Sequence, residues 1–348
     1  MKQWSGAFQI AAVYVGTVVG AGFATGKEIV EFFSRFGFIG FITILMSGFL
    51  FIFLGTKLML RAIDLKASSY EELNENLFGR WFAKGMNIVM MLMLLGVCAV
   101  MLSGSGAVFA EHLGLPKLAG VLLTVILSFV VMLIGVKGLY AVNSFVVPIM
   151  ISFNLILMVY SVTDAHFIKS FFTIPYVDDG WKSIVSPFTY AALNLALSQA
   201  VLVPVAAEVN DKKIVRLGGI LGGALLTLIL ISSHLTLIML PNVALYEIPM
   251  AVVMKGLVTG IYWIYVIIIY GEIFTSVIGN IYGLEKQISK YINVKSVWIY
   301  SGIILIIFSL SKIEYGVLLS LLYPLFGYLS LAFIFLLWFK PFDKQQIK

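Results

Sequence analysis

Long, unbroken apolar runs constrain the fold of this chain more than any other feature. The segments 41–54, 120–136 and 220–231 hold no charged residue, and they run past strand length without the alternation of a transmembrane barrel. Only 11% of the 348 residues are charged, against about 25% in ordinary soluble domains. A soluble core could not bury this much apolar surface. Because backbone polar groups in lipid must be satisfied within helices or closed barrels, the sequence predicts an all-α polytopic membrane protein.

At about 20 residues per crossing, the pattern predicts ten membrane spans. These spans are residues 5–34, 37–60, 85–110, 118–136, 139–161, 184–208, 214–240, 250–284, 296–311 and 315–339. Of the 23 lysine and arginine residues, 16 fall on the side that holds both termini. The positive-inside rule therefore predicts a cell-membrane protein with cytoplasmic termini. It also accounts for the net charge of +6, so we expect no nucleic-acid partner.

The first span is unusually rich in glycine. Gly16, Gly20, Gly22 and Gly26 lie within eleven residues, and each glycine lowers helix stability by about 1 kcal/mol relative to alanine. This spacing predicts a local unwinding of the helix. The alternative is tight helix packing through a small-residue face formed by Gly16 and Gly20.

The sixth span carries polar and helix-breaking residues at its centre. Ser198 and Gln199 lie mid-span and Pro204 follows, which predicts an opening of the backbone near residues 196–200. The first and sixth of ten spans are equivalent members of two five-helix halves, which run in opposite directions because five is odd. Broken helices at matching places in inverted repeats are typical of secondary transporters. We therefore predict a first repeat over residues 1–161 and a second over 184–339.

The first span also carries a family pattern. Its segment GTVVGAGF, residues 16–23, resembles the GxxVGxG motif of the leucine-transporter (LeuT) fold and the related motif of the amino acid/polyamine/organocation (APC) superfamily. The phrase GAGFATGKEIVEFF and the ten spans resemble the YkvI-type bacterial membrane proteins within that group. The resemblance implies a LeuT-like five-plus-five inverted repeat with helices 1 and 6 broken. It also implies a secondary transporter, coupled to sodium or protons, that moves a small amino acid or related metabolite by alternating access.

The same resemblance implies roles for individual residues. Amides at the break in span one would face a substrate carboxylate or a similar anion, and nearby carbonyls would face the coupling cation. The implied substrate-binding residues are Val18, Gly20, Ala21, Gly22, Phe23, Asn194, Ser198 and Gln199. The implied coupling-ion residues are Gly16, Val19, Glu272, Thr275 and Ser276.

Glu272 departs from the family pattern, because an ionisable group is unusual one turn before the Thr275–Ser276 hydroxyl pair. An acid within an apolar helix is costly and marks a functional site by default. Positions 272, 275 and 276 share one helical face. Glu272 could carry a coupling proton or stay ionised beside a sodium ion. The alternative is a structural carboxyl group bonded to a neighbouring helix.

Charged residues at the outer end of span one suggest a gate. Glu28 and Glu31 are three residues apart on one face and could gate or attract a cation, with a solvated vestibule as the alternative. Glu314, at the outer start of span ten, could pair with Lys27 as an outer gate.

Two further function classes are compatible with parts of the sequence. A receptor or sensor subunit could use the same pocket without transport, as permease-like germination proteins do. An intramembrane serine protease would pair Ser103 or Ser105 with His234, but small-residue packing explains this serine-rich stretch better. We expect no catalytic residues, no cofactor and no metal beyond a coupling sodium ion. The expected partners are a small-molecule substrate and the lipid bilayer, and the sequence predicts no oligomeric state.

Overall fold

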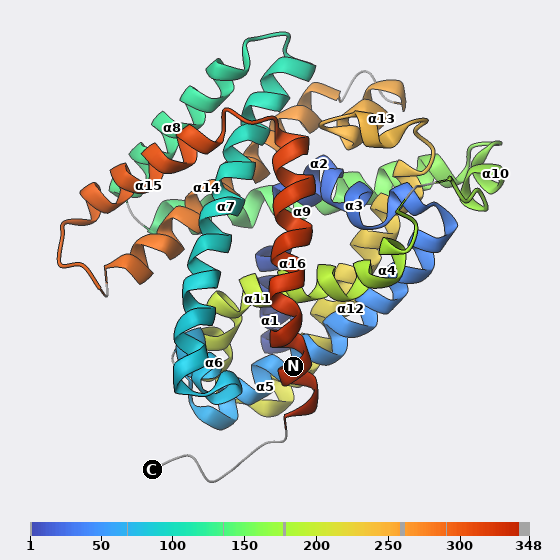
Figure 1. Ribbon diagram of the computed structural model, residues 1–348. Helices are drawn as coiled ribbons and strands as arrows, with labels where there is room; N and C mark the ends of the chain where they lie inside the picture. The colour runs from blue at the N-terminus through green and yellow to red at the C-terminus, as the bar shows by residue number, and fades with distance from the viewer. Residues whose placement is uncertain are drawn as a thin grey trace.

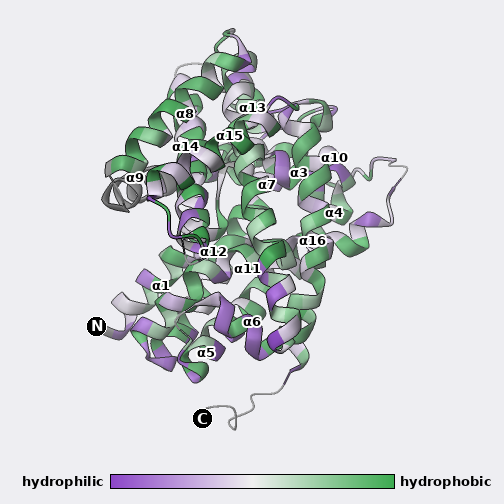
Figure 2. Cartoon of the chain, turned by 60° about the vertical axis from the view of Figure 1, so that its left-hand side comes forward, coloured by the Kyte–Doolittle hydropathy of each residue, from purple (hydrophilic) through white to green (hydrophobic). Residues whose placement is uncertain are grey.

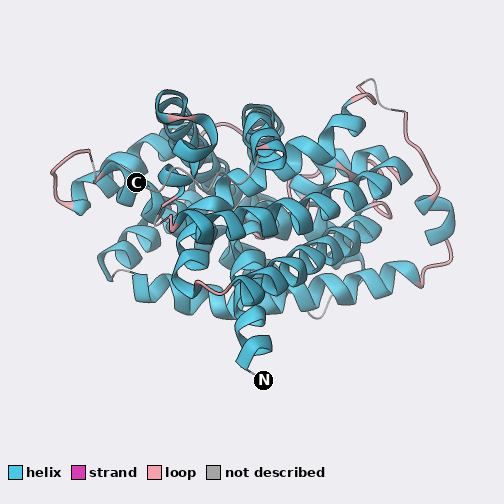
Figure 3. Cartoon of the chain, turned by 90° about the horizontal axis from the view of Figure 1, so that it is seen from below, coloured by secondary structure: helices cyan, strands magenta, loops and turns pink. Residues whose placement is uncertain are grey.

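The computed structural model describes residues 2–67, 69–134, 136–176, 179–257, 262–289 and 291–340. These residues form helices joined by loops and turns, with no strand among them (Figure 3). Large apolar side chains such as Ile126, Ile267 and Phe335 lie exposed on the outer surface of the bundle. This arrangement suits a lipid environment and confirms the predicted all-α membrane fold.

The first half of the chain folds into long helices joined by short ones. Its helices are α1 (Lys2–Val18), α2 (Ala21–Thr25), α3 (Lys27–Phe32), α4 (Phe38–Leu50), α5 (Thr56–Leu65), α6 (Tyr70–Phe78), α7 (Arg80–His112), α8 (Lys117–Ile134), α9 (Val136–Val162) and α10 (Phe167–Phe171). A 3-10 turn at Ser34–Phe36 follows α3. A π-helical turn at Phe51–Gly55 joins α4 to α5. Within that π turn the carbonyl of Phe51 accepts a hydrogen bond of 2.9 Å from the Tyr14 hydroxyl, which ties α1 to the second span.

The second half adds the remaining spans. Its helices are α11 (Lys182–Val209), α12 (Lys212–Leu237), α13 (Pro249–Leu257), α14 (Tyr262–Ile288), α15 (Ser296–Leu310) and α16 (Tyr315–Phe339), with a short 3-10 turn at Val243–Leu245. The predicted eighth span, residues 250–284, covers α13 and the greater part of α14, and residues 258–261 between them lie outside the described residues.

Six described helices are individually long and apolar enough to cross a membrane. They are Phe38–Leu65, Arg80–His112, Lys182–Val209, Lys212–Leu237, Tyr262–Glu285 and Tyr315–Phe339. Shorter apolar helices at Lys117–Leu133, Ile151–Val162 and Ser296–Leu310, together with α1–α3, are consistent with ten spans. The repeat boundaries predicted at 1–161 and 184–339 stay a prediction.

The bundle has two distinct ends. In Figure 1 the chain begins at the same end of the bundle as α5 and α6, whereas α13 lies toward the opposite end. Figure 2 shows apolar residues over most helices and hydrophilic residues gathered around α5 and α6. The helix pairs α1 with α12, α7 with α14, and α11 with α16 pack closely and enclose the centre, where α2 packs against α14.

Helix six is continuous, which makes the prediction of a broken sixth span wrong. α11 runs from Lys182 to Val209 through both Pro187 and Pro204. The helix contains no glycine, and the Ser198 hydroxyl donates to the carbonyl of Leu195 at 3.2 Å. The polar side chains at its centre are therefore accommodated without unwinding the backbone, and neither proline ends the helix.

Candidate functional site

The backbone of helix one is interrupted at Val19 and Gly20, as the glycine spacing predicted. The Val19 amide donates to the carbonyl of Val15 at 2.7 Å, and the ladder resumes where the Gly20 carbonyl accepts from the amides of Phe23 and Ala24 at 3.0 and 3.1 Å. Gly20 itself is extended, with φ −136° and ψ −166°. The carbonyls in the last turn of α1 therefore lie at a helix end, where intrahelical partners are lost.

A second interruption follows at Gly26, which adopts φ +79°. This left-handed conformation favours glycine, and the Gly26 amide donates to the Phe23 carbonyl at 3.1 Å to end α2. A β-carbon here would lie 2.6 Å from Cγ of Met250 in α13. Gly26 thus turns the chain from α2 into α3, and Met250 packs closely against this turn.

One face of α14 lies against the first interruption. The Ser276 hydroxyl is 3.1 Å from the position of a β-carbon on Gly20. Three turns earlier, the Tyr265 hydroxyl lies 3.5 Å from the carbonyl of Ala24. Glu272 lies between Tyr265 and Ser276 on the same face of α14, because residues seven or four apart in a helix share a face. The structure therefore brings Ser276, one of the predicted coupling residues of span eight, to the broken helix.

Glu272 is only 1% exposed. Its Oε1 atom has no hydrogen-bonding partner among the described residues, which is uncommon for a buried carboxyl group. Its backbone carbonyl accepts from the Thr275 hydroxyl at 3.0 Å, so Thr275 is engaged within its own helix. The ion-binding roles of Glu272 and of the carbonyls of Gly16 and Val19 stay predictions.

Glu28 lies on the other side of the interruption. It is 5% exposed, and a β-carbon on Gly22 would overlap its Oε2 atom. The Asn194 amide of α11 donates to the carbonyl of Tyr190 at 3.0 Å and lies 3.5 Å from Oε1 of Glu28. The vestibule alternative therefore fails for Glu28, which is packed into the centre. Glu31 is partly exposed and pairs with Arg35 at 3.3 Å.

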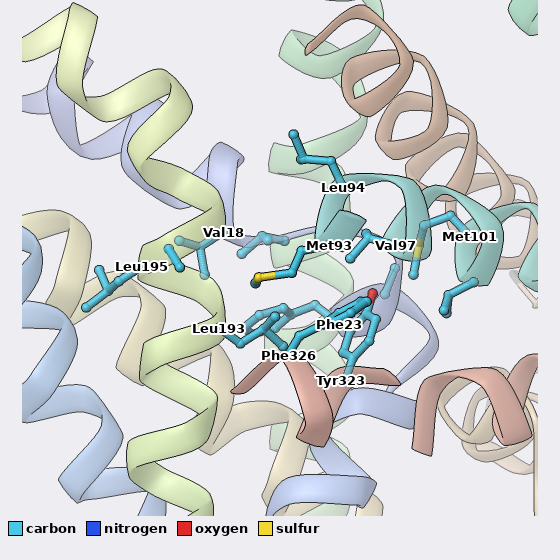
Figure 4. Packing of buried hydrophobic residues seen from close by; sticks show 14 of the residues in the cluster. Val18, Phe23, Met93, Leu94, Val97, Met101, Leu193, Leu195, Tyr323 and Phe326 are labelled. Atoms are coloured by element: carbon cyan, nitrogen blue, oxygen red, sulfur yellow. The ribbon is translucent and has the colours of Figure 1, made fainter. Parts of the chain in front are cut away.

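Aromatic rings gather around Tyr190, whose carbonyl accepts from Asn194 beside this second carboxyl group. The ring of Tyr190 lies 4.9 Å from that of Phe33, 5.1 Å from that of Phe32 and 6.2 Å from that of Phe23. Figure 4 shows Phe23 among Tyr323, Phe326 and Met93, within one buried apolar cluster. Val18 is also buried in this cluster, so two predicted substrate-binding residues are core residues in this conformation.

The remaining predicted site residues have different surroundings. Gln199 is fully buried, and its amide contacts Sδ of Met90 in α7 at 3.4 Å rather than a residue of α2. Ser198 is fully buried and bonds within α11. The side chain of Ala21 lies outside the described residues. At Gly16 a β-carbon would meet nothing within 4 Å, so the small-residue packing alternative has no contact there.

The predicted pair between Lys27 and Glu314 was wrong. The Lys27 amine donates to the carbonyls of Ala244 and Tyr246 at 2.9 and 2.7 Å. Glu314 is exposed and lies 3.6 Å from the amine of Lys117. The sequence could not show that the segment before α13 folds back over α3 and takes the place of a carboxylate partner.

The segment before α13 is also held by Glu111, a contact that the sequence did not predict. Both carboxylate oxygens of Glu111, at the end of α7, accept backbone amides, from Glu247 and Ile248, at 3.1 Å each. The Glu247 side chain in turn accepts from the amide of Gly316 at the start of α16. Residues 244–248, here called the lid segment, thus connect α3, α7 and α16 at the end of the bundle opposite to the chain start.

Other chemistries find little support in the described residues. No group of three or more His, Cys, Asp or Glu residues there could hold a metal ion. His234 lies 3.0 Å from the Ser34 hydroxyl, and Ser103 donates to the carbonyl of Ile313. The Ser103–His234 pair of the protease alternative does not form in the described structure.

Comparison with known proteins gives a full-length relative. The uncharacterized membrane protein YkvI of Bacillus subtilis (strain 168) is 49% identical over 336 residues, which cover 96% of each chain. The protein YyaD of the same organism is 23% identical over 340 residues, covering 97% of this chain and 98% of its own. No family model matches the chain.

Solved transporter structures share the fold. The Eremococcus coleocola manganese transporter, in complex with an aromatic bis-isothiourea substituted compound, superposes with a TM-score of 0.64 at 13% identity and covers 95% of this chain and 77% of its own. Mhp1 in its inward-facing conformation gives a TM-score of 0.59 at 9% identity, with 95% and 75% covered. The architecture of this chain is therefore LeuT-like.

Proposed function

The chain belongs to the family of the Bacillus subtilis membrane protein YkvI, and we propose that it is a cation-coupled secondary transporter of a small amino acid or related metabolite. One observation carries the proposal. Helix one is interrupted in the middle of a LeuT-like bundle, where Ser276 of α14 lies against Gly20, and Glu28, beside Asn194 of α11, lies against Gly22. Such an interruption is how secondary transporters expose backbone groups to cargo and coupling ions.

The α14 side suits the coupling ion. The carbonyls at the end of α1 and the oxygens of Glu272 and Ser276 are ligands that sodium accepts. A buried carboxyl group with an unpartnered oxygen also suits a proton. We propose that Gly16, Val19, Glu272, Thr275 and Ser276 serve this site, with sodium or a proton as the driving ion.

The α11 side suits the substrate. Gly22 brings bare backbone to this side of the break, and Asn194 adds an amide beside Glu28, which lies against Gly22. In the described conformation this space is filled by Phe23 and its apolar neighbours. Alternating access requires that such a packed centre open in turn to either side, with the lid segment as the closure at one end.

An organic cargo fits these residues better than a divalent metal. Manganese prefers several carboxylate, carbonyl or imidazole ligands. The described residues hold no cluster of three such acidic, histidine or cysteine side chains. We therefore propose cell-membrane transport of a small organic molecule, with the chain termini in the cytoplasm.

Uptake into proteoliposomes tests the proposal. We expect accumulation of at least one member of a broad amino-acid and osmolyte panel when a sodium or proton gradient is imposed, and none in its absence. The transport proposal fails if no member of the panel moves under either gradient. Ligand-induced thermal stabilisation without flux would instead favour a receptor.

A further inference from the structure

Glu28 is a buried acid without a basic partner among the described residues. The two nearby basic residues have other partners. The Lys27 amine donates to the lid segment, and Arg35 pairs with Glu31 and with Asp179. No ion pair to Glu28 forms in this part of the chain, where the Asn194 amide approaches its carboxyl group at 3.5 Å. An ionised carboxylate in this position would be poorly compensated.

The remaining surroundings of Glu28 supply no charge. The titratable groups that face it from neighbouring helices are the phenols of Tyr190 in α11 and of Tyr315 and Tyr323 in α16. Phenols are neutral at physiological pH. From α2 it meets the bare backbone of Gly22. The neutral acid is therefore the form that this packed conformation accommodates.

The Glu28 site is separate from the coupling site at α14. Gly20 and Ala24 are four residues apart and contact the Ser276 and Tyr265 hydroxyls, whereas Gly22 contacts Glu28. Residues two apart in a helix differ by about 200°, so Glu28 and the α14 hydroxyls meet different faces of the broken segment. The bundle thus holds two buried acids, Glu272 on α14 and Glu28 on α3.

Glu28 is also joined to the closure of the bundle. Lys27 and Glu28 are consecutive in α3, and α3 hinges on the left-handed Gly26. Lys27 holds the lid segment while Glu28 faces the break. Movement of α3 that releases Lys27 from the Ala244 and Tyr246 carbonyls would therefore also expose the Glu28 carboxyl group to water.

We propose that Glu28 is a proton-binding group of the transport cycle, separate from Glu272, which is protonated while the lid is closed and releases its proton when α3 moves. The proton passes between the carboxyl oxygen and water, and no other group is consumed. This proposal rests on the proposed transport function, and it names a second ion site for it.

Transport by the Glu28→Gln variant tests the proposal, with Glu31→Gln as the matched control on the same helix. Glutamine mimics the protonated acid, so Glu28→Gln should retain exchange of substrate across the vesicle at equal concentrations but lose accumulation driven by a proton gradient. Glu31→Gln should keep both. Loss of exchange together with accumulation would show that Glu28 binds substrate and would overturn the proposal, as would proton-driven accumulation that matches the unmodified protein.

Infrared spectroscopy gives a test that does not depend on transport. A protonated carboxyl group absorbs separately from a carboxylate, and the purified full chain should show such a band that Glu28→Asp shifts and Glu28→Gln removes. If neither variant changes the band, Glu28 is not protonated and the proposal fails. Failure of uptake in every protein with the band still present would instead count against the transport function.

Discussion

The carboxyl group of Glu28 occupies the space that a β-carbon on Gly22 would fill. The two residues lie in different helical segments, α2 and α3, and the left-handed turn at Gly26 folds one back onto the other. The glycine pattern of helix one thus does two things. It interrupts the backbone, and it makes room for an acid beside the interruption.

Replacing Gly22 by alanine should therefore impair transport. The new methyl group must displace Glu28 or shift α2, and overpacking of this kind typically destabilises by about 1–3 kcal/mol. Substrate-dependent uptake and the thermal melting temperature in detergent should both fall. Gly85→Ala in α7 is the control, because a β-carbon there meets nothing within 4 Å and helix propensity improves. Equal losses in the two variants would show that the Glu28 contact is unimportant.

The sequence predicted the fold class and the first broken helix because both depend on local properties, namely apolar length and glycine spacing. It failed where the outcome depends on packing between distant segments. The break predicted in span six did not form, since Pro204 alone is tolerated in a helix without glycine. Glu28 and Glu31 do share spacing on α3, but the turn at Gly26 buries one and leaves the other near solvent. The clamp made by Glu111 joins segments that no local pattern connects.

Sodium coupling should depend on Glu272. Glu272→Gln removes a negative charge from the α14 face that meets Gly20, so the sodium concentration for half-maximal uptake should rise roughly tenfold, equivalent to about 1.4 kcal/mol. Glu285→Gln is the matched control on the same helix, because Glu285 accepts from the Ser296 hydroxyl away from the break. Uptake measured against sodium at constant pH gives the comparison. An unchanged sodium curve in Glu272→Gln would remove this residue from the ion site.

Asp179 should make a small contribution to stability that depends on pH. The pKa of Asp179 lies below its ordinary value, because Lys182 donates a hydrogen bond to it and Arg35 and Lys182 add positive charge nearby. A depressed pKa stabilises the folded state above the unfolded value of about 3.9, and this stabilisation is lost as pH falls through the lower folded value. Asp179→Asn should cost about 0.2–1 kcal/mol at neutral pH.

The stability difference between the unmodified protein and Asp179→Asn should then shrink below about pH 4. Thermal melting of both in detergent across pH 3–7 measures it, using pH values that bracket the reference pKa of an aspartate at about 3.9. A difference that stays constant to the lowest pH would mean that the Asp179→Asn substitution alters packing rather than charge.

Lys27 should hold the lid segment closed. This residue is 8% exposed, and its amine donates to two backbone carbonyls, those of Ala244 and Tyr246, which would lose their charged partner in Lys27→Met. Hydrogen bonds to charged groups contribute about 1.5–3 kcal/mol each, so the lid should open more often. Amide hydrogen exchange over residues 244–248 should accelerate, while exchange in the middle of α16 stays slow. Lys117→Met is the control, because Lys117 pairs at the exposed surface with Glu314. Unchanged exchange in Lys27→Met would mean that Glu111 alone retains the lid, and an equal rise in both variants would mean that the Lys27 contacts are not specifically responsible for closure.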